Sequence, residues 1–201
     1  MPRASYNVKE KLIQVLPSLP EHLIDEFLAI CELHNLKNKQ ILFKSGTASR
    51  TAGFILEGVI RGYYVNTSGV EINSILRVEN TFVGVPEWLS EKAITKYNFE
   101  SIFDSKVITF NLEALEALAI KYPPLFHYYI NGYKETVITL LGRVESAIDK
   151  TPEQRYLELL EKSPLFISKA FNKHIANYLG ITPVSLSRII KRVKDLKPKT
   201  P

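Results

Sequence analysis

The 201-residue sequence predicts an α+β fold, in which an N-terminal antiparallel β-roll with flanking helices precedes a long helix and a C-terminal all-α unit. Three observations support this prediction. Six of the nine glycines separate short apolar segments between residue 35 and about residue 110, a regular apolar stripe follows Pro123, and basic residues gather after Ser168. Short β-branched and aromatic runs between glycine turns are typical of a barrel or jelly roll.

The expected elements begin with an amphipathic helix over residues 20–33, where apolar side chains recur at helical spacing. Short strands are expected over residues 40–43, 54–57 and 60–65. Residues 72–78 alternate between apolar and polar as a half-buried strand does, and the apolar residues of 99–110 continue the pattern. After Asn111 the period becomes helical, which predicts a short helix over residues 112–121.

Pro123 and Pro124 mark the start of a longer helix that runs to about residue 148, because proline suits the first helical position. Apolar residues recur along this helix in steps of four and three, as two helices need in order to pack at a shallow angle. The stripe predicts a homodimer seam, and packing on the chain's own barrel is the alternative. Leu141 and Ile148 form a flanking stripe that we expect to face the barrel. The seam residues are Phe126, Ile130, Tyr133, Val137, Leu140 and Val144.

Residues 149–152 mark the predicted boundary between a sensor domain, residues 1–148 with the dimerisation helix at about 123–148, and a C-terminal domain, residues 149–201. A helix is expected over residues 152–161, ended by Ser163 and Pro164. Residues 171–193 then predict a helix-turn-helix. Ala176 is small where two helices cross, and Gly180 suits the left-handed residue that ends the first helix. Thr182 is a good N-cap for the second helix, which Pro183 starts.

The second helix of this motif carries the predicted function. Apolar residues at positions 186, 189, 190 and 193 bury one face, and the opposite face displays Val184, Arg188 and Lys191. Such a helix can enter a DNA major groove, where we expect Arg188 to read a base and Lys191 and Arg192 to meet phosphates. An ordinary helical hairpin is the alternative. The predicted DNA-contacting residues are Thr182, Val184, Ser185, Ser187, Arg188, Lys191 and Arg192.

The distribution of charge along the chain agrees with DNA binding, and the composition argues against metal-dependent and membrane proteins. Residues 168–201 hold eight basic and one acidic side chain, which leaves a net charge of −2 on the rest of a chain whose total is +5. A basic end on a neutral body is the electrostatic pattern of phosphate binding. The single cysteine, Cys31, and four scattered histidines predict no disulfide, metal site or cofactor. With no signal peptide and no apolar run of spanning length, a cytoplasmic protein without membrane contact is expected.

From about Leu23 to Lys194 the sequence resembles the CRP/FNR family of bacterial regulators. Gly46 after Ile-Leu-Phe-Lys-Ser, residues 54–61 and Phe82-Val-Gly84 match the family's barrel pattern. Residues 178–188 are the stronger match and resemble the recognition motif of a short-tailed branch. The resemblance implies a cyclic-nucleotide-binding-like β-roll, a dimerisation helix and a helix-turn-helix. It also implies a homodimeric transcription regulator whose partners are double-stranded DNA and RNA polymerase.

The sequence departs from the family at the effector pocket. Family members that bind a cyclic nucleotide have a glutamate after the glycine of the Phe-x-Gly motif and, further on, an arginine for the phosphate. Val85 and Thr95 occupy those positions, so cAMP is not expected, because neither side chain replaces the missing interactions. Lys96 leaves a different small-molecule effector open, and a pocket filled by its own aromatic residues, Trp88 among them, is the alternative. The candidate pocket residues are Gly84, Val85, Pro86, Thr95, Lys96 and Tyr97.

The recognition helix also departs from the family. Members that read a guanine-rich half-site have arginine and glutamate where this chain has Pro183 and Val184, although Arg188 matches, so we expect a different DNA preference. Residues 196–201 alone follow Asp195, so the family's usual β-hairpin wing is not expected. A ligand- or partner-binding module that has lost DNA binding is therefore the alternative. No catalytic residues are predicted, because the sequence holds no recognisable nucleophile, carboxylate pair or metal cluster.

Overall fold

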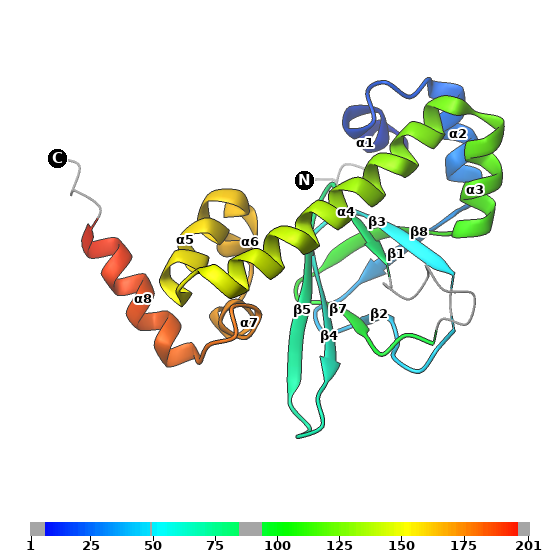
Figure 1. Cartoon of the computed structure of the whole chain (residues 1–201). Coiled ribbons are helices and arrows are strands. Elements are labelled where there is room, and N and C mark those ends of the chain that lie inside the picture. The colour runs from blue at the N-terminus through cyan, green and yellow to red at the C-terminus, as the bar shows by residue number, and fades with distance from the viewer. Residues whose placement is uncertain (1–6, 49, 85–93, 197–201) are drawn as a thin grey trace, which may run out of the picture.

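The computed structural model describes residues 7–48, 50–84 and 94–196 and has the predicted α+β architecture (Figure 1). Two four-stranded antiparallel sheets, with strand orders β1-β8-β3-β6 and β2-β7-β4-β5, form the β-roll. The strands are β1 (Cys31–Leu36), β2 (Ile41–Phe43), β3 (Thr51–Glu57), β4 (Val59–Val65), β5 (Glu71–Val78), β6 (Phe82–Gly84), β7 (Asn98–Ser101) and β8 (Ser105–Asn111).

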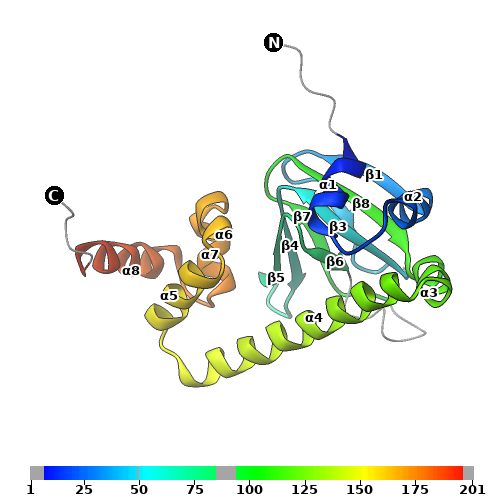
Figure 2. The ribbon, with the colours of Figure 1, turned by 90° about the horizontal axis from the view of Figure 1, so that it is seen from above.

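Helices lie at both ends of the roll and one long helix joins them (Figures 1 and 2). The first three helices and the start of α4 gather against the sheet that contains β3 and β8, and α4 then runs on to the C-terminal group. The helices are α1 (Val8–Val15), α2 (Glu21–Ala29), α3 (Leu112–Lys121), α4 (Pro123–Asp149), α5 (Pro152–Lys162), α6 (Pro164–Lys169), α7 (Asn172–Tyr178) and α8 (Pro183–Leu196).

Three apolar clusters hold these layers together. Between the two sheets, Ile55, Ile60 and Phe99 are fully buried. On the outer face of the first sheet, Phe54 and Phe110 pack against the N-terminal helices. The third cluster joins the C-terminal helices to the roll through β4 and the segment after β7, so the unit after residue 149 shares a core with the β-roll.

Several predicted boundaries are wrong. The helix expected over residues 20–33 ends at Ala29, because residues from Cys31 onward pair with β8 and the strand ladder overrides the helical spacing. His34 consequently lies in a strand, with Nε2 2.7 Å from the Thr109 hydroxyl. Ser163 and Pro164 end α5 as predicted, but Pro164 also starts α6, which the sequence did not indicate. Within the described ranges, no helix is both long and apolar enough to cross a membrane.

Gly58 joins β3 to β4 at a position where a larger side chain should destabilise the fold. Its φ is +103°, and a Cβ at this position would lie 2.6 Å from the Cβ and 2.8 Å from the Cα of Ser105. Gly58→Ala therefore adds overpacking to backbone strain and should lower the free energy of unfolding by about 3 kcal/mol in urea titrations. Gly69→Ala is the control, because its φ is +75° but open space surrounds the added carbon. Equal losses in the two variants would rule out the contact with Ser105 as the cause.

Candidate DNA-binding surface and its junction with the β-roll

The turn between α7 and α8 has the geometry that the sequence predicts. Ala176 is fully buried, and its carbonyl accepts a 3.0 Å hydrogen bond from the Ile181 N–H. Gly180 adopts a φ of +70°, in the left-handed region that glycine favours. The Thr182 hydroxyl oxygen accepts a 3.1 Å hydrogen bond from the Ser185 N–H, which caps the start of α8. These contacts fix the direction in which α8 leaves the turn.

Helix α8 has one buried face and one exposed face. Leu186, Ile189 and Val193 are buried against the C-terminal cluster. The opposite side carries four exposed residues that we call the α8 face, namely Val184, Ser187, Arg188 and Lys191. Within the described part of the chain, neither Arg188 nor Lys191 has an ion-pair partner. Their cationic groups are therefore free to meet an external anion.

The other predicted DNA-contacting residues lie outside the α8 face, and the structure gives them partners within the chain. Arg192 is exposed, but its guanidinium lies 2.7 Å from a carboxylate oxygen of Glu153 in α5. Ser185 is half-buried, and its hydroxyl lies 3.0 Å from that of the exposed Thr182. The structure therefore brings the predicted residues together on one end and side of α8. Contact of these residues with DNA stays a prediction.

Glu158 fastens α5 to the end of α4. Its carboxylate receives Lys150 Nζ at 2.8 Å and Lys162 Nζ at 2.6 Å, and the Ser146 hydroxyl donates to it at 2.9 Å. These donors stabilise the ionised form and lower the pKa of Glu158 to about 2. A capping box between Thr151 and Gln154 starts α5 directly after α4. The orientation of the helix-turn-helix is thus tied to the long helix.

Hydrogen bonds join α7 to β5, which is one of the two edge strands of the second sheet. The Asn73 N–H donates to the Asn177 side-chain oxygen at 2.6 Å, and the Asn177 amide nitrogen donates to the Glu71 carbonyl at 2.8 Å. From α4, Arg143 donates to the carbonyls of Asn73 (3.4 Å) and Tyr178 (3.2 Å), and its guanidinium lies 3.9 Å from the centre of the Tyr178 ring. Three elements, far apart in sequence, therefore meet at this strand edge.

A buried ionic group lies beside this junction. Arg61 is 6% exposed and bonds to Glu71 (2.7 Å), Glu100 (3.0 Å) and the Asn73 side-chain oxygen (3.0 Å). The imidazole of His174 in α7 is buried nearby, and desolvation, together with the charge of Arg61, lowers its pKa to about 4. His174 is therefore neutral at pH 7. The sequence reasoning missed this junction, although Asn177 and His174, polar residues next to the buried Ala176, were its signal.

The predicted dimer seam divides into two parts. Its second half is open, since Val137, Leu140 and Val144 are 54%, 49% and 58% exposed in the single chain. In the first half, Ile130 and Tyr133 are half-buried, whereas Phe126 is 46% exposed. The expectation that Leu141 and Ile148 face the barrel is wrong, because they are 58% and 76% exposed and widen the apolar surface instead.

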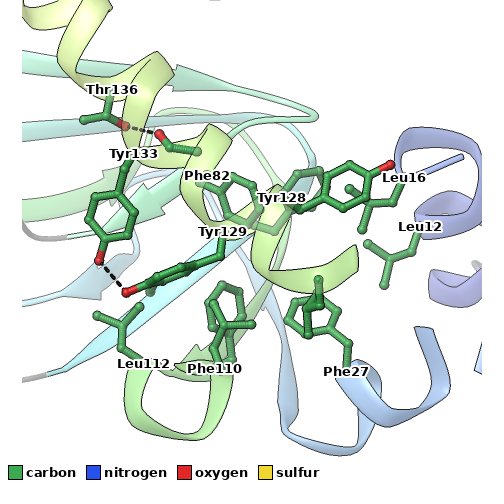
Figure 3. A pocket seen from close by; sticks show the side chains of 15 residues that line it. Leu12, Leu16, Phe27, Phe82, Phe110, Leu112, Tyr128, Tyr129, Tyr133 and Thr136 are labelled. Atoms are coloured by element: carbon green, nitrogen blue, oxygen red, sulfur yellow. Dashed lines mark hydrogen bonds between the residues drawn. The ribbon is translucent and has the colours of Figure 1, made fainter. Parts of the chain in front are cut away.

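The first half of α4 packs on the β-roll. Tyr129 and Tyr133 line an apolar cavity of about 60 Å³ together with Phe82 and Phe110, and their two hydroxyls lie 3.1 Å apart (Figure 3). The Tyr129 hydroxyl also donates to Glu116 at 2.7 Å, and burial is the main cause of its raised pKa. The alternative of packing on the chain's own barrel thus holds for Tyr133 and fails for the residues from Val137 onward.

The predicted effector pocket is described only in part, because Val85 and Pro86 lie outside the described residues. Gly84 ends β6, and Thr95 is buried, with its hydroxyl oxygen accepting a 3.0 Å hydrogen bond from the Tyr97 N–H. Lys96 is exposed, and its ammonium lies 5.3 Å from the centre of the Tyr97 ring. Thr95 therefore has a structural role in its own loop, and an effector at these residues stays a prediction.

Comparison with solved structures gives the same architecture. FixK2 from Bradyrhizobium japonicum superposes with a TM-score of 0.69 at 14% identity, over 83% of this chain and 85% of that chain. A variant of CooA from Carboxydothermus hydrogenoformans gives a TM-score of 0.68 at 15% identity, over 92% and 84% of the two chains. The c-di-GMP responsive global regulator CLP of Xanthomonas campestris gives a TM-score of 0.67 at 15% identity, over 88% and 92%.

These proteins are regulators of the CRP/FNR family, so the chain has the fold of that family. The resemblance noted in the sequence is confirmed at the level of the fold. No protein-family model matches the chain, and no curated protein matches its sequence. At this low identity the likeness defines the architecture, and the binding chemistry has to be argued from the chain's own residues.

The buried His174 predicts how stability depends on pH. The unfolded chain takes up this proton near pH 6.5 and the folded chain near pH 4, so the unfolded state binds more protons between these values. The free energy of unfolding should therefore fall as the pH drops from 6.5 to 4, by up to about 3 kcal/mol from this group. Denaturant titrations across this range should show a shallower pH dependence for His174→Gln, whereas the exposed His22→Gln should keep the slope of the natural chain.

Proposed function

We propose that the chain is a homodimeric, sequence-specific DNA-binding transcription regulator of the CRP/FNR type. The observation that supports this most directly is the α8 face, in which Arg188 and Lys191 are exposed on a helix held from behind by buried Leu186, Ile189 and Val193. A cationic helix supported in this way fits a B-DNA major groove.

The residues of the α8 face divide by chemistry. The planar guanidinium of Arg188 matches the two acceptors of guanine, so we assign it to base readout. Lys191 carries a point charge suited to phosphate, and the hydroxyls of Thr182 and Ser185 lie at the helix N-terminus, where backbone N–H groups also attract phosphate. Val184 offers an apolar contact for a thymine methyl group. Arg192 is ion-paired with Glu153. To contact a DNA phosphate it has to break this ion pair or bind both groups at once.

Dimerisation through α4 completes the proposed function. The exposed apolar surface from Val137 to Ile148 has the spacing for a helix pair, which would present two α8 helices to successive major grooves about 34 Å apart. RNA polymerase is the expected further partner. A small-molecule effector other than cAMP stays open, and a pocket filled by its own aromatic side chains is the alternative. Selection of bound fragments from random DNA tests the proposal, because the absence of an enriched, near-palindromic motif would favour a module that has lost DNA binding.

Arg188→Ala should weaken binding to the selected site by about 1 to 3 kcal/mol and relax specificity at one base position per half-site. The reason is the loss of a bidentate hydrogen-bonded contact between the Arg188 guanidinium and one base. Affinities for all single-base variants of the site should be measured by fluorescence anisotropy at fixed salt. Lys44→Ala, an exposed change on the β-roll, is the charge-matched control. A uniform loss over every sequence would instead make Arg188 a phosphate contact.

Leu140→Glu should convert the dimer into a monomer, because it places an unpaired charge in the centre of the proposed seam. We expect the dimer dissociation constant to rise by about 100-fold or more. Sedimentation velocity gives the measurement. Ile120→Glu is the matched control, since Ile120 is 80% exposed on α3, away from the seam. An unchanged dimer in the Leu140 variant would place the interface elsewhere.

A further inference from the structure

A second cavity lies where the β-roll, the long helix and the C-terminal helices meet. It has a volume of about 190 Å³ and is lined by residues of β5, α4, α5, α6 and α7. None of the predicted effector-pocket residues that the structure describes lines it. We call it the β5 cavity, since β5 supplies its floor, including Ser74 and Arg77. Its position between the sensor sheet and the helix-turn-helix gives any occupant contact with both units.

Arg77 is the unusual group in this cavity. It is half-buried, and its guanidinium has no hydrogen bond and no ion pair to any residue in the described ranges. Glu135 and Tyr178 act on it electrostatically without bonding to it, and desolvation lowers its pKa. An arginine withdrawn from water without a partner is costly, and such groups are normally paired. An anion in the cavity would lower this cost.

Two neighbours define what kind of anion fits. The Ser74 hydroxyl, three residues before Arg77 on the same strand, is buried without a hydrogen-bond partner. Arg143 also lines the cavity, but its guanidinium already donates to two backbone carbonyls and stacks on Tyr178. One uncommitted cation and one uncommitted hydroxyl match a single carboxylate better than a dianionic phosphate. The remaining wall is largely apolar and includes Leu140, Leu159 and Phe166.

We propose that the β5 cavity binds a small organic monocarboxylate, whose carboxylate pairs with Arg77 and whose apolar body lies against Leu159 and Phe166. The volume agrees with a ligand of this size, because a protein cavity of about 150 Å³ holds one benzene ring. The ligand would bridge β5 and the C-terminal helices and so stabilise their present arrangement. This inference goes beyond the proposed function, since the binding itself requires no DNA.

Benzoate and phenylacetate are the probes for the test, with benzamide as the uncharged control and inorganic phosphate as the competing anion. Each is added to the full chain in thermal-shift and calorimetric titrations. Either carboxylate at about a hundredfold excess over its Kd should raise Tm by about 5 to 10 °C, and benzamide should not. Binding of phosphate without either carboxylate, equal binding of benzamide, or no binding by either carboxylate would overturn the assignment.

Variants locate the site and separate this inference from DNA binding. Arg77→Met should weaken carboxylate binding about 10- to 100-fold, yet leave the Tm of the free protein unchanged or higher, because it removes an unpaired charge. Arg77→Lys should restore part of the affinity. Arg188→Met should relax base preference at one position per half-site and leave carboxylate binding intact, so each proposal can fail alone. Unchanged carboxylate affinity in the Arg77→Met protein, or a lower Tm without ligand, would show that Arg77 serves another role.

Discussion

The open edge of β5 is the constraint on which the rest of the molecule depends. An edge strand presents unpaired N–H and C=O groups, and proteins must cover or satisfy them. Here the Asn177 side chain acts like a short piece of neighbouring strand, since it accepts from the Asn73 N–H and donates to the Glu71 carbonyl. Arg143 donates to the Asn73 carbonyl from α4. The same hydrogen bonds that close the sheet therefore hold the first helix of the helix-turn-helix and the long helix α4 in place.

The ionic group behind this edge makes the junction specific. Arg61 is buried between Glu71 and Glu100, so two carboxylates from β5 and β7 surround one guanidinium from β4. Burying the charges of Arg61 and Glu100 is expensive, and replacing buried charges with apolar side chains is often neutral or stabilising, so net stability is a poor explanation for the arrangement. The hydrogen bonds of this group are directional, so they couple the position of the sheet to that of α7. Because Arg61 also holds the Asn73 side chain, whose amide donates to the His174 carbonyl, a shift of the sheet is transmitted to α7.

The sequence predicts most accurately where short-range rules decide the outcome. The cap at Thr182, the left-handed Gly180 and the buried stripe of α8 follow from local chemistry, and the structure agrees with each. The junction contacts were beyond this reasoning, because Asn73 and Asn177 are 104 residues apart and no local pattern pairs them. The prediction of which α4 residues face the β-roll and which face away from it was half right for the same reason. Heptad spacing gives the stripe, but only the tertiary arrangement shows that Tyr133 turns toward the roll while Leu141 and Ile148 do not.

The position of the α8 face follows from contacts that converge on one strand. Helix α7 bonds to the edge of β5, α4 reaches the same edge through Arg143, and the β5 cavity opens beside them with Arg77 at its floor. Apolar contacts tolerate sliding, whereas hydrogen bonds weaken steeply once their distance or angle departs from the optimum. A change at β5 of about one ångström would weaken the Asn177 contacts that hold α7 to the sheet edge. Hydrogen bonds at β5 therefore fix how α7 lies on the sheet, while the shared apolar cluster keeps the C-terminal helices joined to the β-roll.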